Sequence, residues 1–173
     1  GYSQRDQLVT RLLQVGIDRQ FSSNIVEALG DGLHVALCGA GSPLPSPTAS
    51  GPCVAVIANG ELYVVDVGSN SPRNLGRMGL PVAALEGVFI THFHSDHIDG
   101  LGEIMTLRWA GGDFDTPLPV YGPTGIDRVV AGFNEAYALD FGYRQAHHGD
   151  AVAPLNAAGS QAVSFIKPPA GET

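Results

Sequence analysis

The spacing of apolar residues changes near residue 30, and this change divides the chain into two predicted parts. Between residues 4 and 29, apolar side chains recur three or four positions apart, with a break near Gly16. Such spacing is typical of amphipathic helices and predicts two short ones. We therefore expect a helical extension over residues 1–30 and a folded domain over residues 31–173.

From Leu33 onward the apolar residues form short runs that are typical of strands. Asn59-Gly60 separates two of these runs, and this dipeptide between apolar segments is a strong hairpin signal. Amphipathic stretches with helical spacing lie between the later strands. Strands that alternate with helices predict an α/β fold built in layers. Strands are predicted at residues 33–38, 54–58, 62–67, 87–91 and 118–121, and helices at 73–79, 98–109 and 124–138.

Composition supports a folded domain and disfavours one class of partner. The chain has 173 residues, 44% of them apolar, which is enough to bury a core. Its formal net charge is −8, and its nine lysines and arginines are scattered along the sequence. Because nucleic-acid surfaces normally carry a basic patch, we expect that nucleic acid is not the partner.

The cysteines and the first residue bear on the compartment. Cys38 and Cys53 are the two cysteines, and the sequence leaves open whether they form a disulfide or are two small buried residues. No apolar run is long enough to span a bilayer, so we expect no membrane contact by this segment. The chain begins at Gly1 and not at Met. We hypothesise export from a bacterial cytoplasm, or tethering to a membrane, with a leading signal removed; a cytoplasmic location is the alternative.

The segment 91–100 carries the chemistry that the sequence suggests. Three of the six histidines fall within six residues, at the end of a predicted strand. His92 and His94 are two positions apart on extended chain, so their side chains point the same way and can share one metal. Asp96 and His97 follow where the chain turns into a helix, and are predicted to bind a second metal. Nitrogen and carboxylate donors without thiolate favour Zn²⁺, with manganese or iron as replacements.

His92-x-His94-x-Asp96-His97 resembles the HxHxDH signature of the metallo-β-lactamase superfamily. The resemblance extends over roughly residues 33–140 and is strongest to the branch that holds ribonuclease Z and the arylsulfatase-type hydrolases. It implies the first half of an αββα sandwich, in which Asp66 supports the metal-bearing loop from behind the ligands. Ser95 and the segment 98–100 favour the arylsulfatase-type group. Further matching segments lie at residues 39–43, 62–68 and 119–125.

The resemblance implies a hydrolase with two zinc ions. We expect it to act on a small anionic ester, an arylsulfate or a phosphodiester, with Asp96 binding one metal and orienting or deprotonating the attacking water. Two alternatives stay open: an endonuclease that processes tRNA 3′ ends, and a metal-binding protein without turnover. His147 and His148 are expected in a solvated turn and not at the metals.

Four donors cannot fill two tetrahedral metal sites. The superfamily takes its later ligands from a second half of the fold, and residues 149–173 contain no histidine. Residues 167–173 have the composition of a linker. We therefore expect the missing ligands to come from a C-terminal half outside this chain or from a second subunit.

Overall fold

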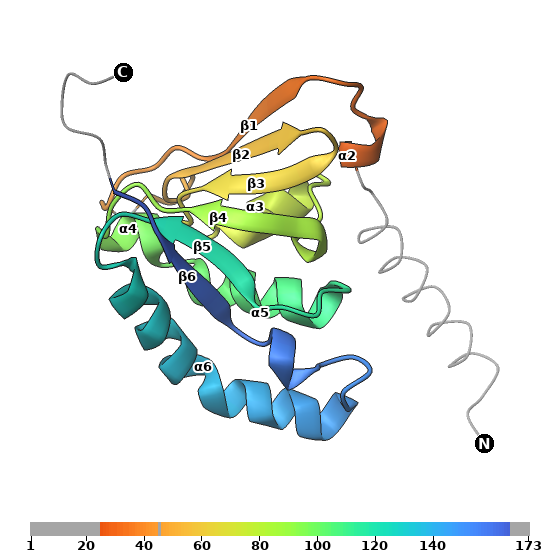
Figure 1. The fold of residues 1–173 in the computed structure, drawn as a ribbon. Coiled ribbons are helices and arrows are strands. Elements are labelled where there is room, and N and C mark those ends of the chain that lie inside the picture. Colours follow the sequence, from red (N-terminus) through yellow and green to blue (C-terminus); the bar gives the residue numbers. More distant parts are fainter. Residues whose placement is uncertain (1–24, 45, 167–173) are drawn as a thin grey trace, which may run out of the picture.

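The computed structural model describes residues 25–44 and 46–166 and is built around one six-stranded sheet (Figure 1). The strands lie in the order β1-β2-β3-β4-β5-β6, which is also their order in the sequence. Neighbours are antiparallel from β1 to β3 and parallel from β3 to β6. The strands are β1 (Leu33–Gly39), β2 (Cys53–Ala58), β3 (Glu61–Val65), β4 (Leu85–Phe89), β5 (Leu118–Gly122) and β6 (Ser160–Ser164).

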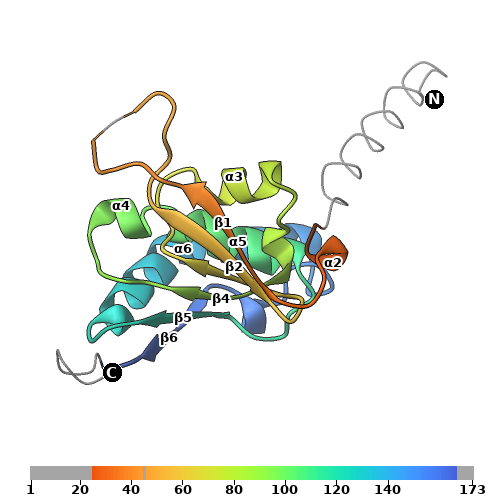
Figure 2. The same ribbon diagram turned by 90° about the horizontal axis from the view of Figure 1, so that it is seen from above.

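Helices lie in each connection between parallel strands, and the predicted mixed α/β class is confirmed. Figure 2, which looks along the sheet, shows α3, α5 and α6 on one side of it. Most of the predicted helical extension and all of the predicted linker lie outside the described residues, so these two predictions are not tested. The helices are α2 (Ile25–Ala28), α3 (Ser71–Arg77), α4 (Ser95–Ile98), α5 (Leu101–Gly111) and α6 (Ile126–His148), with short 3₁₀ turns η1 (Val82–Ala84) and η2 (Leu155–Ala157).

The predicted hairpin between β2 and β3 is present. Asn59 and Gly60 have φ angles of 53° and 78°, which is the left-handed conformation that a two-residue hairpin turn of this kind needs. Ala58 pairs with Glu61 across the turn. The turn therefore fixes the register of the two strands, and with it the residue at which β3 ends.

Alternation along the strands separates a buried face from an open one. Residues of the buried face have essentially no exposed surface and pack under the helices. On the other face the β1 side chains Leu33, Val35 and Leu37 are exposed, and Tyr63, Phe89 and Tyr121 form a row of ring contacts. Paired residues of the buried face include Ala55 with Val64, Val64 with Val88 and Val88 with Val120.

Two differences from the predicted elements have simple causes. α6 runs to His148, ten residues beyond its predicted end, because polar residues after position 138 weaken the apolar period but contain no proline. β6 was not predicted, since Ser160–Ser164 is short and mostly small or polar. It pairs with β5 at the edge of the described sheet, where polar strands are tolerated.

Cys38 and Cys53 form a disulfide, which resolves the alternative that the sequence left open. Their Cα atoms are 5.0 Å apart, and the bond joins the end of β1 to the start of β2. It closes the base of the loop between these strands. Structural disulfides are typical of oxidising compartments, and the compartment of this protein stays a prediction.

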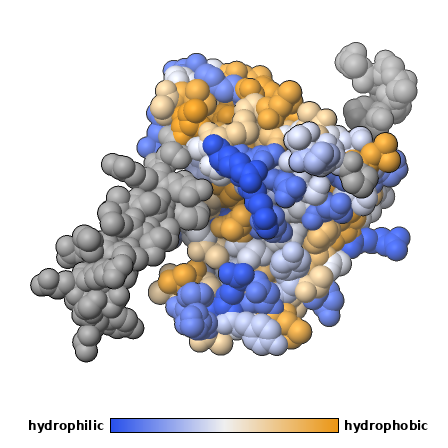
Figure 3. All heavy atoms as spheres, turned by 180° about the vertical axis from the view of Figure 1, so that it is seen from behind, coloured by the Kyte–Doolittle hydropathy of each residue, from blue (hydrophilic) through white to orange (hydrophobic). Residues whose placement is uncertain are grey.

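The helix side of the molecule has a mixed surface. Figure 3 shows hydrophilic residues in a row across this side, with hydrophobic residues gathered above them. Within residues 25–44 and 46–166, no helix combines the length and the apolar character that a membrane span requires.

Candidate metal centre

The histidine segment lies where β4 leaves the sheet and α4 begins. β4 ends at Phe89, two residues before the predicted end, and Ile90 is then buried and donates its N–H to the carbonyl of Tyr121 at 2.7 Å. The chain continues extended as far as His94, whose φ and ψ are −66° and 146°. An anchored, extended segment thus presents its side chains at the end of the sheet where the carboxyl ends of the parallel strands meet.

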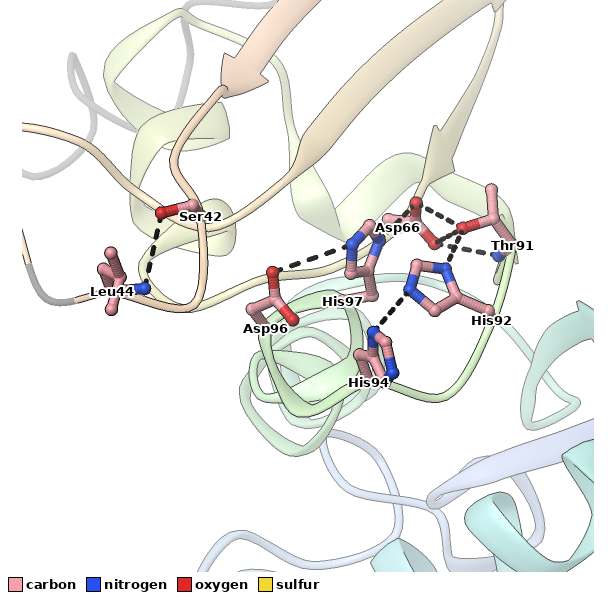
Figure 4. A network of polar contacts seen from close by, with 8 residues as sticks. All are labelled: Ser42, Leu44, Asp66, Thr91, His92, His94, Asp96 and His97. Carbon is pink, nitrogen blue, oxygen red and sulfur yellow. Dashed lines mark hydrogen bonds and ion pairs between the residues drawn. The ribbon is translucent and has the colours of Figure 1, made fainter.

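His92 and His94 point to the same side, as their spacing predicts (Figure 4). His92 Nε2 lies 3.1 Å from His94 Nδ1. Both residues are exposed. One pair of imidazole nitrogens is therefore held together at a point that solvent can reach.

Asp96 and His97 form a second pair on the first turn of α4. His97 Nε2 lies 3.7 Å from Asp96 Oδ2, and both side chains are largely buried. The rings of His92 and His97 have centroids 4.0 Å apart, so the two pairs are adjacent. All four residues singled out by the sequence lie in one cluster.

Asp66 lies behind this cluster. It follows β3 with a φ of 59°, and its side chain is 9% exposed. One oxygen, Oδ1, accepts the backbone N–H of Thr91 at 2.8 Å, and the other, Oδ2, lies 2.8 Å from His97 Nδ1. Asp66 therefore links the end of β3 both to the histidine segment and to the first turn of α4.

Backbone contacts hold α4 against the end of β3. Val67 donates its N–H to the carbonyl of His97 at 2.8 Å, and Gly100 donates to the carbonyl of Val67 at 2.9 Å. A Cβ atom at Gly68 would collide with the carbonyl oxygen of Asp96 and with Gly51. Only glycine at position 68 allows this approach. The Asp66-Val67-Gly68 segment thus packs against α4 and holds in place the helix that carries Asp96 and His97.

The donor spacing can be compared with what a metal needs. Two nitrogen ligands with metal bonds of about 2.0–2.1 Å in tetrahedral geometry are roughly 3.3 Å apart. The pair His92 and His94, at 3.1 Å, matches this separation, and the pair Asp96 and His97, at 3.7 Å, lies slightly beyond it. Across the part of the chain that the structure describes, no group of three or more His, Cys, Asp or Glu side chains is arranged to hold a metal. The four side chains thus form two pairs of donor atoms, each with a spacing near that of two ligands on one metal.

His147 and His148 lie far from the cluster. α6 begins beside it, where Gly125 packs against the ring of Phe93. The helix has 23 residues and so spans about 34 Å at 1.5 Å per residue. Both histidines are exposed in its last turn, at the opposite end from α4 (Figure 1). They are solvated, as predicted, although they end a helix and do not form a turn.

Thr91 also contacts this cluster, although the sequence alone indicates no role for it. Its hydroxyl oxygen lies 2.8 Å from Asp66 Oδ2 and 3.0 Å from His92 Nδ1. The sequence does show a hydroxyl residue directly before the first histidine of the segment. It was not informative by itself, because exposed threonines at strand ends are common.

Comparison with known proteins finds ribonuclease Z proteins among those similar to this chain. A family model described as anti-Pycsar protein Apyc1 matches residues 34–115. Ribonuclease Z of Mycobacterium avium is 39% identical over 124 residues, and ribonuclease Z of Mycolicibacterium gilvum is 36% identical over 124 residues. These alignments cover 70% of this chain but 44% and 43% of the relatives. The chain thus spans less than half the length of the curated relatives it matches.

Solved structures show the same relationship. Human tRNase Z, short form, superposes with a TM-score of 0.54 and 28% identity over 60% of this chain and 39% of the human chain. A metallo-β-lactamase fold protein of Bacillus subtilis superposes with a TM-score of 0.52 over 79% of this chain and 46% of its own, at 19% identity. The second match shows the fold alone.

These relatives overturn the expected partner. We expected a small-molecule ester and considered nucleic acid unlikely, but the matching ribonuclease Z proteins are named for RNA, and the human structure for tRNA. The lean toward the arylsulfatase-type group, based on Ser95 and residues 98–100, has no support either. The prediction from net charge was wrong because net charge is a sum over the whole sequence, whereas a phosphate is bound by a few local groups. Motif, fold and relatives agree that the chain has a metallo-β-lactamase fold and is ribonuclease Z-like over the residues that match.

Proposed function

We propose that the protein to which this chain belongs is a metal-dependent phosphodiesterase that cleaves RNA, with the 3′ ends of tRNA precursors as its substrate class. The observation that carries the proposal is the cluster of two donor pairs at the end of the sheet, in a chain 39% identical to a ribonuclease Z. Because the chain spans 44% of that relative, the activity is proposed for the whole protein.

In this proposal His92 and His94 hold one metal ion, and Asp96 and His97 hold the other. Imidazole and carboxylate donors suit zinc, with manganese or iron as replacements. When bound, such ions polarise a phosphoryl oxygen and make water nucleophilic near neutral pH. Each proposed position has two protein donors from this chain, whereas a catalytic zinc site has three. We propose that the further donors come from parts of the protein outside this chain.

Asp96 has a second role in the proposal. It is the one carboxylate among the four donors, and its side chain is 12% exposed. A buried carboxylate beside the reacting phosphate can orient the attacking water and accept its proton. Asp66 does not take this role in the proposal, because both of its oxygens already have contacts with Thr91 and His97.

The negative net charge of the chain is compatible with an RNA substrate. Metal ions are the strongest local charges in a site of this kind, and they attract a phosphate whatever the sum over the whole surface. His92 and His94 are exposed, so one side of the cluster is open to a large substrate. The proposal therefore requires no basic stripe on the part of the chain that the structure describes.

The test uses the full-length protein, a tRNA precursor with a 3′ trailer, and zinc analysis of the same samples. We expect the wild-type protein to bind zinc and release the trailer, and His94→Ala to lose zinc and at least about 100-fold in activity, beyond what loss of an outer partner costs. His148→Ala is the matched control, since the same residue type is removed from the far end of α6. Zinc binding with hydrolysis of nitrophenyl sulfate but no RNA cleavage would refute the proposal, as would equal metal loss in both variants.

A further inference from the structure

We infer that Thr91 is a positioning residue whose hydroxyl fixes the tautomer of His92. Its function rests on the proposed metal centre, but the hydrogen bonds that carry the inference belong to the protein itself. They run from the Asp66 carboxylate to the Thr91 hydroxyl, and from that hydroxyl to His92 Nδ1 (Figure 4).

The direction of each hydrogen bond follows from counting protons. A threonine hydroxyl has one proton to donate and lone pairs that accept, whereas an ionised carboxylate can only accept. Asp66 Oδ1 accepts the backbone N–H of Thr91 at 2.8 Å, and Asp66 Oδ2 lies 2.8 Å from the Thr91 hydroxyl. The Thr91 hydroxyl therefore donates its one proton to Asp66.

His92 must then be the donor in the remaining contact. Its Nδ1 lies 3.0 Å from the same hydroxyl oxygen, which can now only accept. A neutral imidazole carries one proton, so a proton on Nδ1 leaves a lone pair on Nε2. Nε2 is the atom that faces His94 Nδ1 at 3.1 Å, where the proposed metal position lies.

The same carboxylate acts on a second histidine without an intermediate. Asp66 Oδ2 lies 2.8 Å from His97 Nδ1, which places the proton of that ring on Nδ1 and the lone pair on Nε2, toward Asp96. One buried carboxylate thus sets the tautomers of two proposed ligands, His97 directly and His92 through Thr91. Partners of this kind orient metal-binding histidines and raise their affinity for the ion.

The chain allows the hydroxyl to be removed with little other change. Thr91 is exposed, so Thr91→Val keeps the shape of the side chain, and the backbone N–H still donates to Asp66. Thr91→Ser restores the hydroxyl without the methyl group. Ser95→Ala is a matched control: it removes a hydroxyl four residues away that is exposed and has no hydrogen-bond partner among the described side chains.

The experiment measures two quantities on the full-length protein. The first is the ¹⁵N chemical shifts of the His92 ring without metal, assigned with a His92→Gln spectrum. The second is zinc affinity by competition with a chelator. We expect His92 to be protonated on Nδ1 in wild type, Thr91→Ser and Ser95→Ala, and to show mixed tautomers in Thr91→Val. Zinc affinity should fall roughly 10- to 100-fold in Thr91→Val and stay within about threefold in the other two variants.

The outcomes separate this inference from the proposed function. If Thr91→Val keeps the wild-type ¹⁵N shifts and zinc affinity, or if Thr91→Ser fails to restore them, Thr91 does not position His92. If Thr91→Val changes the tautomer as expected while the wild-type protein does not cleave RNA, the positioning role stands and the proposed function is wrong.

Discussion

Two buried polar groups lie at opposite ends of β4, and they differ in the kind of partner that satisfies them. At the first residue of the strand, Arg108 donates to the carbonyl oxygens of Leu85 at 2.7 Å and Thr116 at 2.9 Å. Its guanidinium also lies 3.5 Å from the centre of the Phe114 ring. Burial lowers the pKa of Arg108. Every one of these contacts ends on backbone or on an aromatic ring.

At the other end of the strand, Asp66 is bound by side chains that have further polar atoms. Thr91 and His97 each contact Asp66 with one atom and present another to the histidine cluster. A buried polar group whose partners are backbone groups stabilises the fold. A buried polar group whose partners also contact other polar side chains can orient the residues of a site. The comparison predicts that the two groups respond differently to substitution.

The largest expected effect is on stability, at Arg108. Arg108→Met would leave two carbonyl oxygens without their charged donor, and we expect the free energy of unfolding to fall by about 4 kcal/mol. Zinc affinity should stay within about threefold. Chemical denaturation with a zinc titration of the refolded protein measures both, and Arg128→Met, at an exposed position on α6, is the control. A large loss of zinc affinity in a folded Arg108→Met protein would contradict the comparison.

Loss of the Cys38–Cys53 disulfide should have a similar but smaller effect. The bond spans a sequence separation of 15, and removing it from a loop of this size costs about 3 kcal/mol in the chain-entropy model. We expect a Cys38→Ser/Cys53→Ser protein to unfold at lower denaturant concentration. An unchanged unfolding midpoint, with the wild-type disulfide verified by mass spectrometry, would show that the loop is held by its other contacts.

Asp66→Asn should show the reverse pattern. The amide keeps the size of the side chain but brings its own donor to a place where two donors already point. We expect zinc affinity to fall roughly 10- to 100-fold, whereas the free energy of unfolding should change by no more than about 1.5 kcal/mol. Should stability collapse while zinc affinity is retained, Asp66 would belong with Arg108 as a group that serves the fold.

The smallest effect concerns Tyr63, on the open face of the sheet. A hydrogen bond from its hydroxyl to Glu61 at 2.8 Å, together with burial, raises the pKa of Tyr63 to about 12. A raised pKa in the folded state stabilises the fold below the ordinary tyrosine value of 10.0, and this contribution is lost as pH rises from 10 toward 12. Glu61→Gln should move the ultraviolet titration of Tyr63 toward 10, without any effect on zinc affinity. An unchanged titration would assign the raised pKa to burial and to the nearby Glu86 and Tyr121.

The sequence predicted the elements with strong local signals. The hairpin turn at Asn59 and Gly60 and the four donors at positions 92 to 97 depend on neighbours in the chain, and the structure brings them together where expected. β6 could not be predicted, because its stability comes from pairing with β5 and not from its own polar residues. The disulfide needed the distance between two strands, which spacing in the sequence does not contain.

The site itself shows the same division. The four proposed donors and their spacing follow from the sequence, whereas the link from Asp66 through Thr91 to His92 depends on a contact across 25 residues. The partner was predicted wrongly because net charge does not report which groups face a substrate. The residue types of the proposed site could thus be predicted from the sequence, whereas contacts between residues far apart in the sequence could be identified only in the folded structure.

We propose that the two donor pairs hold two metal ions in the full-length protein. Anomalous diffraction from crystals of the zinc-loaded full-length protein, at the zinc absorption edge, tests it most directly. We expect two peaks, one bonded to His92 Nε2 and His94 Nδ1 and the other to Asp96 and His97 Nε2, at distances of about 2.0–2.2 Å. Zinc bound elsewhere, or absence of anomalous density at these four residues in a fully loaded protein, would contradict it.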